Sequence, residues 1–416
     1  MKKQVVLFGS LILALALLIL VESCKKKSDT VTFTMSALVA QLLGGNIDMN
    51  GATSPNNVPA NPTIVATFSS PVNSASVTAN AVTLVRDYDT KNIELTFTVS
   101  GNSITIVPKT SLGNGALFSL NLSSITSTDG QSMAAVKRTF TTIGTFVPDG
   151  MVAYYSFENT ASDVLNRFNP MVGGVIDLTY ATSYSTAAGM AAKFNGTSTL
   201  IRIPKGDSLM LTNDFTLAFW IFADTTSRKG QFTMGVAGWY GFQFEIFGAY
   251  DGCKLAAQYA FEDGTSGSED LFFAGDGLTK DNGGWKGWTF CKDLKTSGGV
   301  KFLLGSKWAY VTCRYKSDTK LGTMYINGEK MKEQDYNLYD PPKTTVTGIK
   351  YNGAVGNNTF VFGFIQDKNN PTIADDWAKY ENPANNHFKG LLDNVRIFHK
   401  ALTEKEIQMM YDSEKL

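Results

Sequence analysis

Strand-forming residues fill the stretch Asn61-Pro62-Thr63-Ile64-Val65-Ala66-Thr67-Phe68-Ser69-Ser70-Pro71-Val72, and turn-forming residues flank it. Short runs rich in β-branched and aromatic residues, separated by Gly, Asn and Asp, are typical of antiparallel strands. The pattern recurs as far as Thr142, which predicts six strands and two turns: Thr63–Phe68, Ala81–Arg86, Ile93–Val99, Ser103–Val107, Phe118–Leu122 and Arg138–Thr142, with Gly101-Asn102 and Asp129-Gly130 between strands. This density of short strands predicts an all-β sandwich.

The same stretches resemble the bacterial Ig-like domains of surface proteins. The resemblance is carried by Asn61–Val72 as the opening strand and by Ser103–Pro108 and Arg138–Thr142 as later strands. We assign residues 46–146 to this domain. The resemblance implies a spacer or interaction module without an active site.

A second series of strand-like stretches begins at Met151. Five of them, in family order, resemble elements of the laminin G-like, concanavalin A-like jelly roll: Ala192–Pro204, Asp214–Ile221, Lys307–Val311, Gly322–Glu329 and Phe388–Phe398. The resemblance covers residues 150–416, and we assign residues 147–416 to this domain, with long inserted loops. The chain is therefore predicted to be all-β, an Ig-like β-sandwich followed by a concanavalin A-like jelly-roll sandwich.

Two short helices complete the predicted fold. Near the mature N-terminus, apolar residues repeat at helical spacing before Gly44, namely Met35, Leu38, Val39, Leu42 and Leu43. At the C-terminus, Thr403 and Glu406 have the spacing of a capping box, and Leu402 and Ile407 that of a hydrophobic staple.

The first 23 residues have the pattern of an export signal. Lys2 and Lys3 precede an uncharged apolar run from Val5 to Val21, and Cys24 follows Ser23. The stretch Val21-Glu22-Ser23-Cys24 resembles the lipobox of bacterial lipoproteins, which implies that Cys24 carries a lipid. Residues 24–45 would then be a tether with a short helix. The position directly after Cys24 is Lys25 and not Asp, and in a lipoprotein this implies sorting to the outer membrane. An uncleaved membrane anchor is the alternative.

Composition narrows the function classes. Basic and acidic residues are equal at 37 each, and no basic run lies outside the first 27 residues. A nucleic-acid partner is not expected, because binding phosphates requires a concentrated positive face. With two histidines in the chain and no Cys-x-x-Cys motif, zinc and redox chemistry are not expected either.

Three cysteines follow Cys24, an odd number for an exported chain. Cys313 lies in a strand-like run and is interpreted as a core residue. Cys253 and Cys291 lie in a segment, Gly248 to Gly305, with 12 Gly in 58 residues. We expect this segment to form long surface loops, with a disulfide between its two cysteines.

Aromatic residues in loops are the candidate ligand-binding residues. An aromatic ring stacks on the C–H face of a sugar, while Trp N–H and Tyr O–H groups reach hydroxyls. Two Gly-flanked pairs and one residue of a later loop are selected: Trp285 and Trp288, Trp239 and Tyr240, and Trp377. The alternative is that they cover the sandwich edge, as expected for the core residues Trp220 and Trp308.

Catalytic carboxylates were sought and not found. Laminarinase-type glycosidases of related fold carry paired acidic residues on one strand, where alternation directs both into one cleft. Glu245 lies in an alternating strand but has no carboxylate two residues away. An inverting pair from separate loops stays open.

A structural calcium ion is the metal expected, since the resemblance implies one held by carboxylate and carbonyl oxygens. Asp393 occupies the matching position, with Glu158 near it; an ordinary surface Asp is the alternative. The sequence thus predicts a lipid-anchored surface protein that binds a glycan without cleaving it. A glycoside hydrolase or lyase, or a protein-binding adhesin, remains as an alternative.

Overall fold

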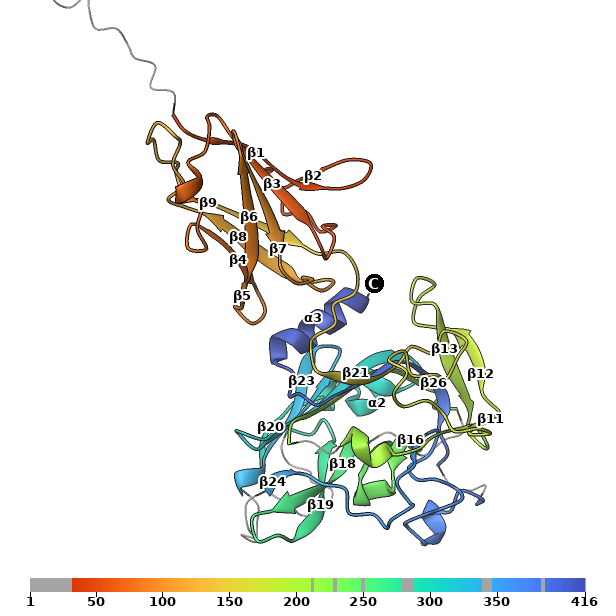
Figure 1. The fold of residues 1–416 in the computed structure, drawn as a ribbon. Helices are drawn as coiled ribbons and strands as arrows, with labels where there is room; N and C mark the ends of the chain where they lie inside the picture. Colours follow the sequence, from red (N-terminus) through yellow and green to blue (C-terminus); the bar gives the residue numbers. More distant parts are fainter. Residues whose placement is uncertain are drawn as a thin grey trace, which may run out of the picture. The chain divides into compact units, whose positions relative to one another are not determined.

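The computed structural model describes residues 32–210, 213–226, 230–247, 251–277, 287–338, 346–382 and 386–415. Residue contacts divide the chain into two units, with the boundary between Ile143 and Gly144. Nearly all the regular secondary structure of both units is β-strand, as Figure 1 shows. The predicted all-β fold class is confirmed.

The first unit is a sandwich of two sheets. The five-stranded sheet has the order β2 (Ile47–Asp48), β1 (Met35–Gln41), β3 (Thr63–Phe68), β7 (Ser103–Pro108) and β6 (Leu95–Ser100). The four-stranded sheet has the order β5 (Asn92–Ile93), β4 (Val82–Arg86), β8 (Leu117–Leu122) and β9 (Val136–Thr141). Gly101-Asn102 joins β6 to β7 as a two-residue hairpin, and the positive φ of Gly101 suits this turn.

The predicted helix at residues 35–43 is wrong, because this segment is strand β1. β1 pairs with β3 from Met35 to Gln41, so its backbone is satisfied by a partner distant in sequence. Leu38 and Ala40 are buried at the two-residue spacing of a strand. Leu43, which completed the helical pattern, is fully exposed. The first sandwich thus takes in residues that were predicted to be tether.

The second unit is a larger sandwich. The nine-stranded sheet has the order β12 (Thr179–Thr182), β13 (Met190–Asn195), β26 (Lys389–Phe398), β15 (Phe215–Ala223), β21 (Trp308–Lys316), β22 (Leu321–Ile326), β23 (Glu329–Asp335) and β20 (Trp288–Cys291), and β10 (Met151–Tyr155) also pairs with β26. The eight-stranded sheet has the order β11 (Val175–Ile176), β14 (Leu200–Ile203), β25 (Phe360–Phe362), β16 (Gln231–Val236), β17 (Phe242–Phe247), β18 (Gly252–Phe261) and β19 (Ser266–Phe273), and β24 (Val346–Ile349) pairs with β18. One continuous apolar core fills the space between the two sheets.

The prediction of long surface loops in the Gly-rich segment from residue 248 to residue 305 is wrong for its described part. Where it is described, it forms β18, β19, β20 and helix α2 (Gly299–Leu304) instead of long surface loops. Tyr259 and Phe261 of β18 belong to the central core. Gly252 explains part of the glycine content, since a Cβ there would lie 2.3 Å from the Phe272 ring. Close packing of a neighbouring side chain requires glycine at this position.

The predicted disulfide between Cys253 and Cys291 is wrong, because both thiols and that of Cys313 are free and buried. Cys253 lies in the eight-stranded sheet and Cys291 at the edge of the nine-stranded sheet. Cys253 Sγ lies 3.6 Å from Met324 Sδ, whereas Cys291 Sγ lies 3.8 Å from Asp276 Oδ1. Burial raises the pKa of the Cys253 thiol, which keeps it protonated as an ordinary core group.

The C-terminal helix α3 (Glu404–Glu414) covers the outer face of the nine-stranded sheet. Its predicted capping box is confirmed, since Thr403 and Glu406 exchange hydrogen bonds with each other's backbone N–H. Trp220 Nε1 donates to Glu414 Oε2 at 2.7 Å, and Arg396 Nη1 lies 2.5 Å from Glu414 Oε1. Trp220 is buried as predicted. Within the described part of the chain, no helix is both long and apolar enough to cross a membrane.

Candidate functional site

The outer face of the eight-stranded sheet carries a second apolar cluster. In β25, Phe360 and Phe362 point into the central core, whereas Val361 points to the opposite side. Phe232 of β16 belongs to the same outer cluster. The cluster is completed by Leu200, Phe364, Ile365, Ile373 and Ala378, against which Trp239, Tyr240 and Tyr380 are partly buried.

The segment from residue 364 to residue 382 leaves β25 and packs over this face. The buried side chain of Gln366 braces it from within. Its Nε2 donates to the carbonyls of Ile373 and Ala378 at 2.9 and 2.8 Å, and its Oε1 accepts from the backbone N–H groups of Thr372 and Ile373. Asp367 anchors the segment to the sheet through two hydrogen bonds from Arg202, at 2.7 and 2.8 Å. The segment is therefore held as a defined loop.

A tight turn after β16 places two of the predicted ligand-binding residues. Ala237 and Gly238 both have positive φ, and the short 3₁₀ helix η3 (Gly238–Tyr240) follows. A side chain at Gly238 would collide with Ile373, since a Cβ would lie 2.4 Å from its Cδ1. The Gly238 N–H donates to the Ile365 carbonyl at 2.9 Å. The turn and the loop therefore hold each other in place.

Three of the five predicted ligand-binding residues come together here, and we call Trp239, Tyr240 and Trp377 the aromatic platform. The Trp239 and Trp377 rings stack with centroids 5.5 Å apart and an interplanar angle of 21°. Tyr240 stacks on Trp239 at 6.0 Å and 26°. Trp377, in helix η7 (Asp376–Ala378), is 41% exposed and rests edge-on against Phe232. The three rings are nearly parallel, and Trp377 is the one that is exposed, whereas Trp239 and Tyr240 are partly buried.

A polar group that the sequence did not reveal lies on the same face. Lys254 Nζ is 3.1 Å from Glu245 Oε1 and 2.8 Å from Asp270 Oδ2, and we call these three residues the polar triad. Glu245 is paired in register with Phe232, the residue beneath Trp377, so their side chains are neighbours on one face. Burial raises the pKa of Glu245 and outweighs the ammonium of Lys254. The pKa of Lys254 is also raised, because the attraction of the two carboxylates outweighs its burial.

Sequence reasoning missed the triad because its carboxylates lie on different strands. Glu245 is on β17 and Asp270 on β19, with Lys254 on β18 between them. Spacing within one strand does not bring these residues together, whereas register across three strands does. Alternation in β17 and β19 was the available signal, since it directs both carboxylates away from the core.

The other predicted aromatic residues do not join the platform. Trp285 lies outside the described residues. Trp288 belongs to β20, at the edge of the nine-stranded sheet, where it is half-buried and the Lys332 ammonium lies 5.5 Å from its ring centroid. Trp308, which was expected to be a core residue like Trp220, is half-buried instead, with its ring edge-on to Tyr184.

Asp393 and Glu158 form the predicted calcium position. Asp393 is buried, accepts a hydrogen bond from the Ser183 hydroxyl, and accepts another from the Asn394 N–H. Burial, with repulsion from Glu158 among the smaller causes, raises the pKa of Asp393 to about 7. Such oxygen groups suit a hard cation. The described residues hold no cluster of three or more His, Cys, Asp or Glu side chains, so hydroxyl, carbonyl or water oxygens would have to complete the ligand set.

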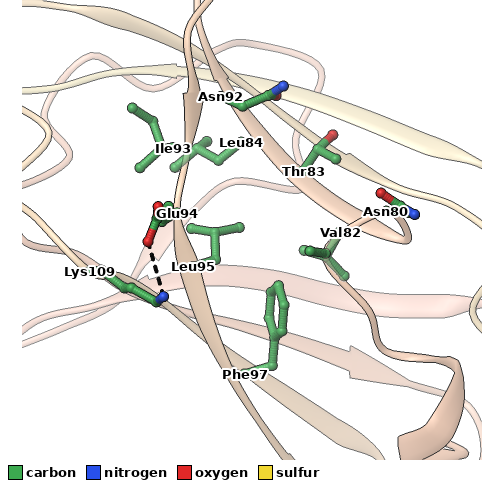
Figure 2. Close-up of a pocket in the computed structure, with 11 residues that line it drawn as sticks. Asn80, Val82, Thr83, Leu84, Asn92, Ile93, Glu94, Leu95, Phe97 and Lys109 are labelled. Atoms are coloured by element: carbon green, nitrogen blue, oxygen red, sulfur yellow. Dashed lines mark hydrogen bonds and ion pairs between the residues drawn. The ribbon is translucent and has the colours of Figure 1, made fainter.

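A hollow of about 430 Å³ lies in the first unit, shown in Figure 2. It is the gap at one side of the sandwich, where β5 and β6 are sheet edges. Leu84, Leu95 and Phe97 line it, and the ion pair between Glu94 and Lys109 lies beside it at 3.0 Å. Its lining is aliphatic and aromatic except for this ion pair and a few amides and hydroxyls, so we assign no chemistry to it.

Comparison with protein families identifies the first unit. Residues 47–142 match the model of the bacterial Ig-like domain. This match begins after β1, so that the strand at residues 35–41 lies outside it. A search of the curated proteins gives no match.

Comparison with solved structures gives likenesses over about two thirds of the chain. Domain 4 of an extracellular arabinanase from Geobacillus stearothermophilus, in complex with arabinotriose, is 19% identical at a TM-score of 0.38, over 63% of this chain and 98% of that one. The ligand-binding domain of botulinum neurotoxin serotype D, in complex with N-acetylneuraminic acid, is 13% identical at a TM-score of 0.40, over 64% and 51%.

Proposed function

We propose that the second unit binds a carbohydrate through the aromatic platform and does not cleave it. The observation that supports this proposal is the stack of Trp239 and Trp377, which holds an indole 41% exposed on a braced loop. A large apolar ring left in water is an unfavourable arrangement that a stacking ligand relieves. Parallel rings suit the flat C–H faces of successive sugar units, and neighbouring carboxylates accept hydrogen bonds from hydroxyls.

Alanine substitutions test the platform. In the detergent-solubilised full chain, Trp377→Ala and Trp239→Ala should each weaken retention in a polysaccharide affinity gel by about tenfold, which corresponds to ~1–2 kcal/mol per lost ring. Trp377→Phe keeps a ring and should retain most of the binding. Thermal denaturation provides the control, because Tm should change little for the exposed Trp377. Equal retention of wild type and both alanine variants by every polymer tested would remove the site from this face.

Glycoside hydrolysis is the second candidate, and the polar triad favours it. Contacts to one ammonium keep Glu245 Oε1 and Asp270 Oδ2 within about 6 Å of each other. Retaining glycosidases hold their two carboxyl groups about 5–5.5 Å apart, one as acid and one as nucleophile. The raised pKa of Glu245 suits an acid. We rank hydrolysis second because Lys254 occupies the space where a glycosidic bond would lie.

An assay of reducing-sugar release separates binding from hydrolysis. The wild type should release no reducing ends from any polysaccharide that the affinity gel retains. Release that Glu245→Gln abolishes, while the gel still retains the variant, would establish the enzyme instead.

We propose further that Cys24 carries the lipid that anchors the chain at the bacterial outer membrane. The apolar run from Val5 to Val21, followed by Ser23-Cys24, supports this proposal. Cys24→Ala should leave the precursor uncleaved and remove it from the lipid-labelled fraction. A processed, labelled variant would contradict lipidation.

We also propose a structural calcium ion at Asp393 and Glu158. Binding to the folded state alone raises stability with ligand concentration. Calcium should therefore raise the Tm of the wild type relative to a chelator, and Asp393→Asn should abolish that increase. An equal Tm in calcium and in chelator would contradict the site.

A further inference from the structure

The aromatic platform is bordered by acidic groups on two sides, and we infer that it selects sugars by charge. The site takes neutral or amine-bearing glycans and rejects uronate-containing and sulfated ones. This inference rests on the proposed carbohydrate-binding function and names the class of ligand for that same site.

The first acidic group lies at the rim of the aromatic platform, next to Trp377 in the chain. Asp375 and Asp376 immediately precede Trp377, and both are exposed. Asp376 forms an ion pair with Lys379 at 2.6 Å, which leaves the charge of Asp375 in excess. Residues 364–382 contain four acidic and two basic residues, and Arg202 pairs with one of the acidic ones. The loop with its anchor therefore carries one excess negative charge beside the exposed indole.

The second acidic group is the polar triad. Two carboxylates share the Lys254 ammonium, so the triad has one excess negative charge whenever Glu245 is ionised. The side chains of Glu245, Lys254 and Asp270 are 9%, 13% and 21% exposed. A charge with so little water around it is weakly screened by salt. It therefore acts on any charged group that approaches the same sheet face.

A third observation concerns the hydrogen-bonding groups of the sheet face beneath the platform, which are those of the polar triad and of Gln243. Gln243, two residues before Glu245 on β17, is 1% exposed, and its Oε1 has no hydrogen-bond partner among the described residues. These groups are thus three acceptors, two carboxylates and an amide oxygen, and one donor, the Lys254 ammonium. Acceptors match the hydroxyl, amide and ammonium donors of neutral and amino sugars. The one ammonium among them is already held by both carboxylates, so a carboxylate or sulfate would meet like charge.

A panel of polymers tests the inference by affinity gel electrophoresis of the full chain. Neutral arabinan, laminarin and galactomannan, amine-bearing chitosan, and anionic alginate, polygalacturonate and heparin are the probes. At least one neutral or amine-bearing polymer should retard the wild type, and Trp377→Ala should lose that retardation. Retardation by an anionic polymer that depends equally on Trp377 would overturn the charge selection and leave the platform intact. Loss of Trp377 dependence for every polymer would instead overturn the proposed function itself.

Rim variants sharpen the test without touching the platform. Asp375→Asn combined with Asp376→Asn removes two exposed negative charges and should not disturb folding. This variant should bind the anionic polymers several-fold better, lose several-fold in chitosan binding, and keep the wild-type retention by the neutral polymers. Lys368→Gln is the matched control, since it changes charge in the opposite direction on the same loop. Unchanged anionic binding in the Asp375/Asp376 variant would contradict the inference.

Discussion

The second unit has a tryptophan on the outer face of each of its two sheets, and the two side chains differ in burial. On the nine-stranded sheet, Trp220 stacks on Tyr184 at 4.2 Å, donates its N–H to Glu414 and is 5% exposed. On the eight-stranded sheet, Trp377 stacks on Trp239 and stays 41% exposed. Helix α3 closes the first face, and a braced loop presents the ring on the second.

The difference shows which features separate a structural aromatic residue from a candidate binding residue. Trp220 has its ring faces and its N–H used by the protein itself. Around Trp377 the loop is fixed by Gln366 and by the Arg202–Asp367 pair, while the indole, packed on Trp239, stays 41% exposed. A rigid loop that exposes an apolar ring has lower ordering cost when a ligand binds.

The largest effect should come from breaking the closed face. Trp220→Ala should destabilise the second unit by about 3–5 kcal/mol, because it creates a cavity and leaves a buried Glu414 oxygen without its donor. Thermal denaturation should show Tm lower by roughly 10 °C. Trp377→Ala on the open face is the matched comparison and should cost only about 1 kcal/mol, for the lost ring contacts. Equal destabilisation by both substitutions would mean that the two faces do not differ.

An intermediate effect should come from loosening the support of the open face. Gln366→Leu leaves two carbonyls and two N–H groups of the loop without partners, which should cost about 1–3 kcal/mol of stability. It should also weaken polysaccharide binding, because Trp377 is no longer held against Trp239. Asn370→Ala, an exposed position on the same loop, should change neither quantity. Full binding by Gln366→Leu would show that the platform does not depend on its brace.

Sequence reasoning succeeded where the determining interactions are local. Two-residue alternation located β3 and β7. The spacing of Thr403 and Glu406 predicted the start of α3. The prediction for β1 was wrong, because pairing with β3 outweighs an apolar pattern that also fits a helix. The cysteine interpretation failed for a related reason, since nearness in sequence did not reveal that Cys253 and Cys291 lie in different sheets.

The candidate site was only partly predictable. Gly-flanking and loop position selected Trp239, Tyr240 and Trp377 individually. That Trp377 stacks on Trp239, more than a hundred residues earlier, follows from the pairing of β16 with β25 and from the return of the loop over that pair. Predicting the polar triad would have required the register of β17, β18 and β19. Strand register across a sheet is set by packing and turn geometry, which a single-strand pattern does not contain.

The smallest effect is expected at Trp288, which was selected from sequence on the same grounds as Trp377. Trp288 lies on edge strand β20, and the ring with the Lys332 ammonium near it is half-buried. Trp288→Ala should therefore cost roughly 1 kcal/mol of stability through the lost cation–π contact and ring burial, seen as a small decrease in Tm. Its polysaccharide binding should stay within twofold of wild type, and Trp288→Phe should restore most of the stability. A loss of binding as large as that of Trp377→Ala, at unchanged Tm, would place sugar on the nine-stranded sheet as well. The contrast between a closed and an open face would then fail, because exposure on a braced loop would no longer be what distinguishes the binding aromatics.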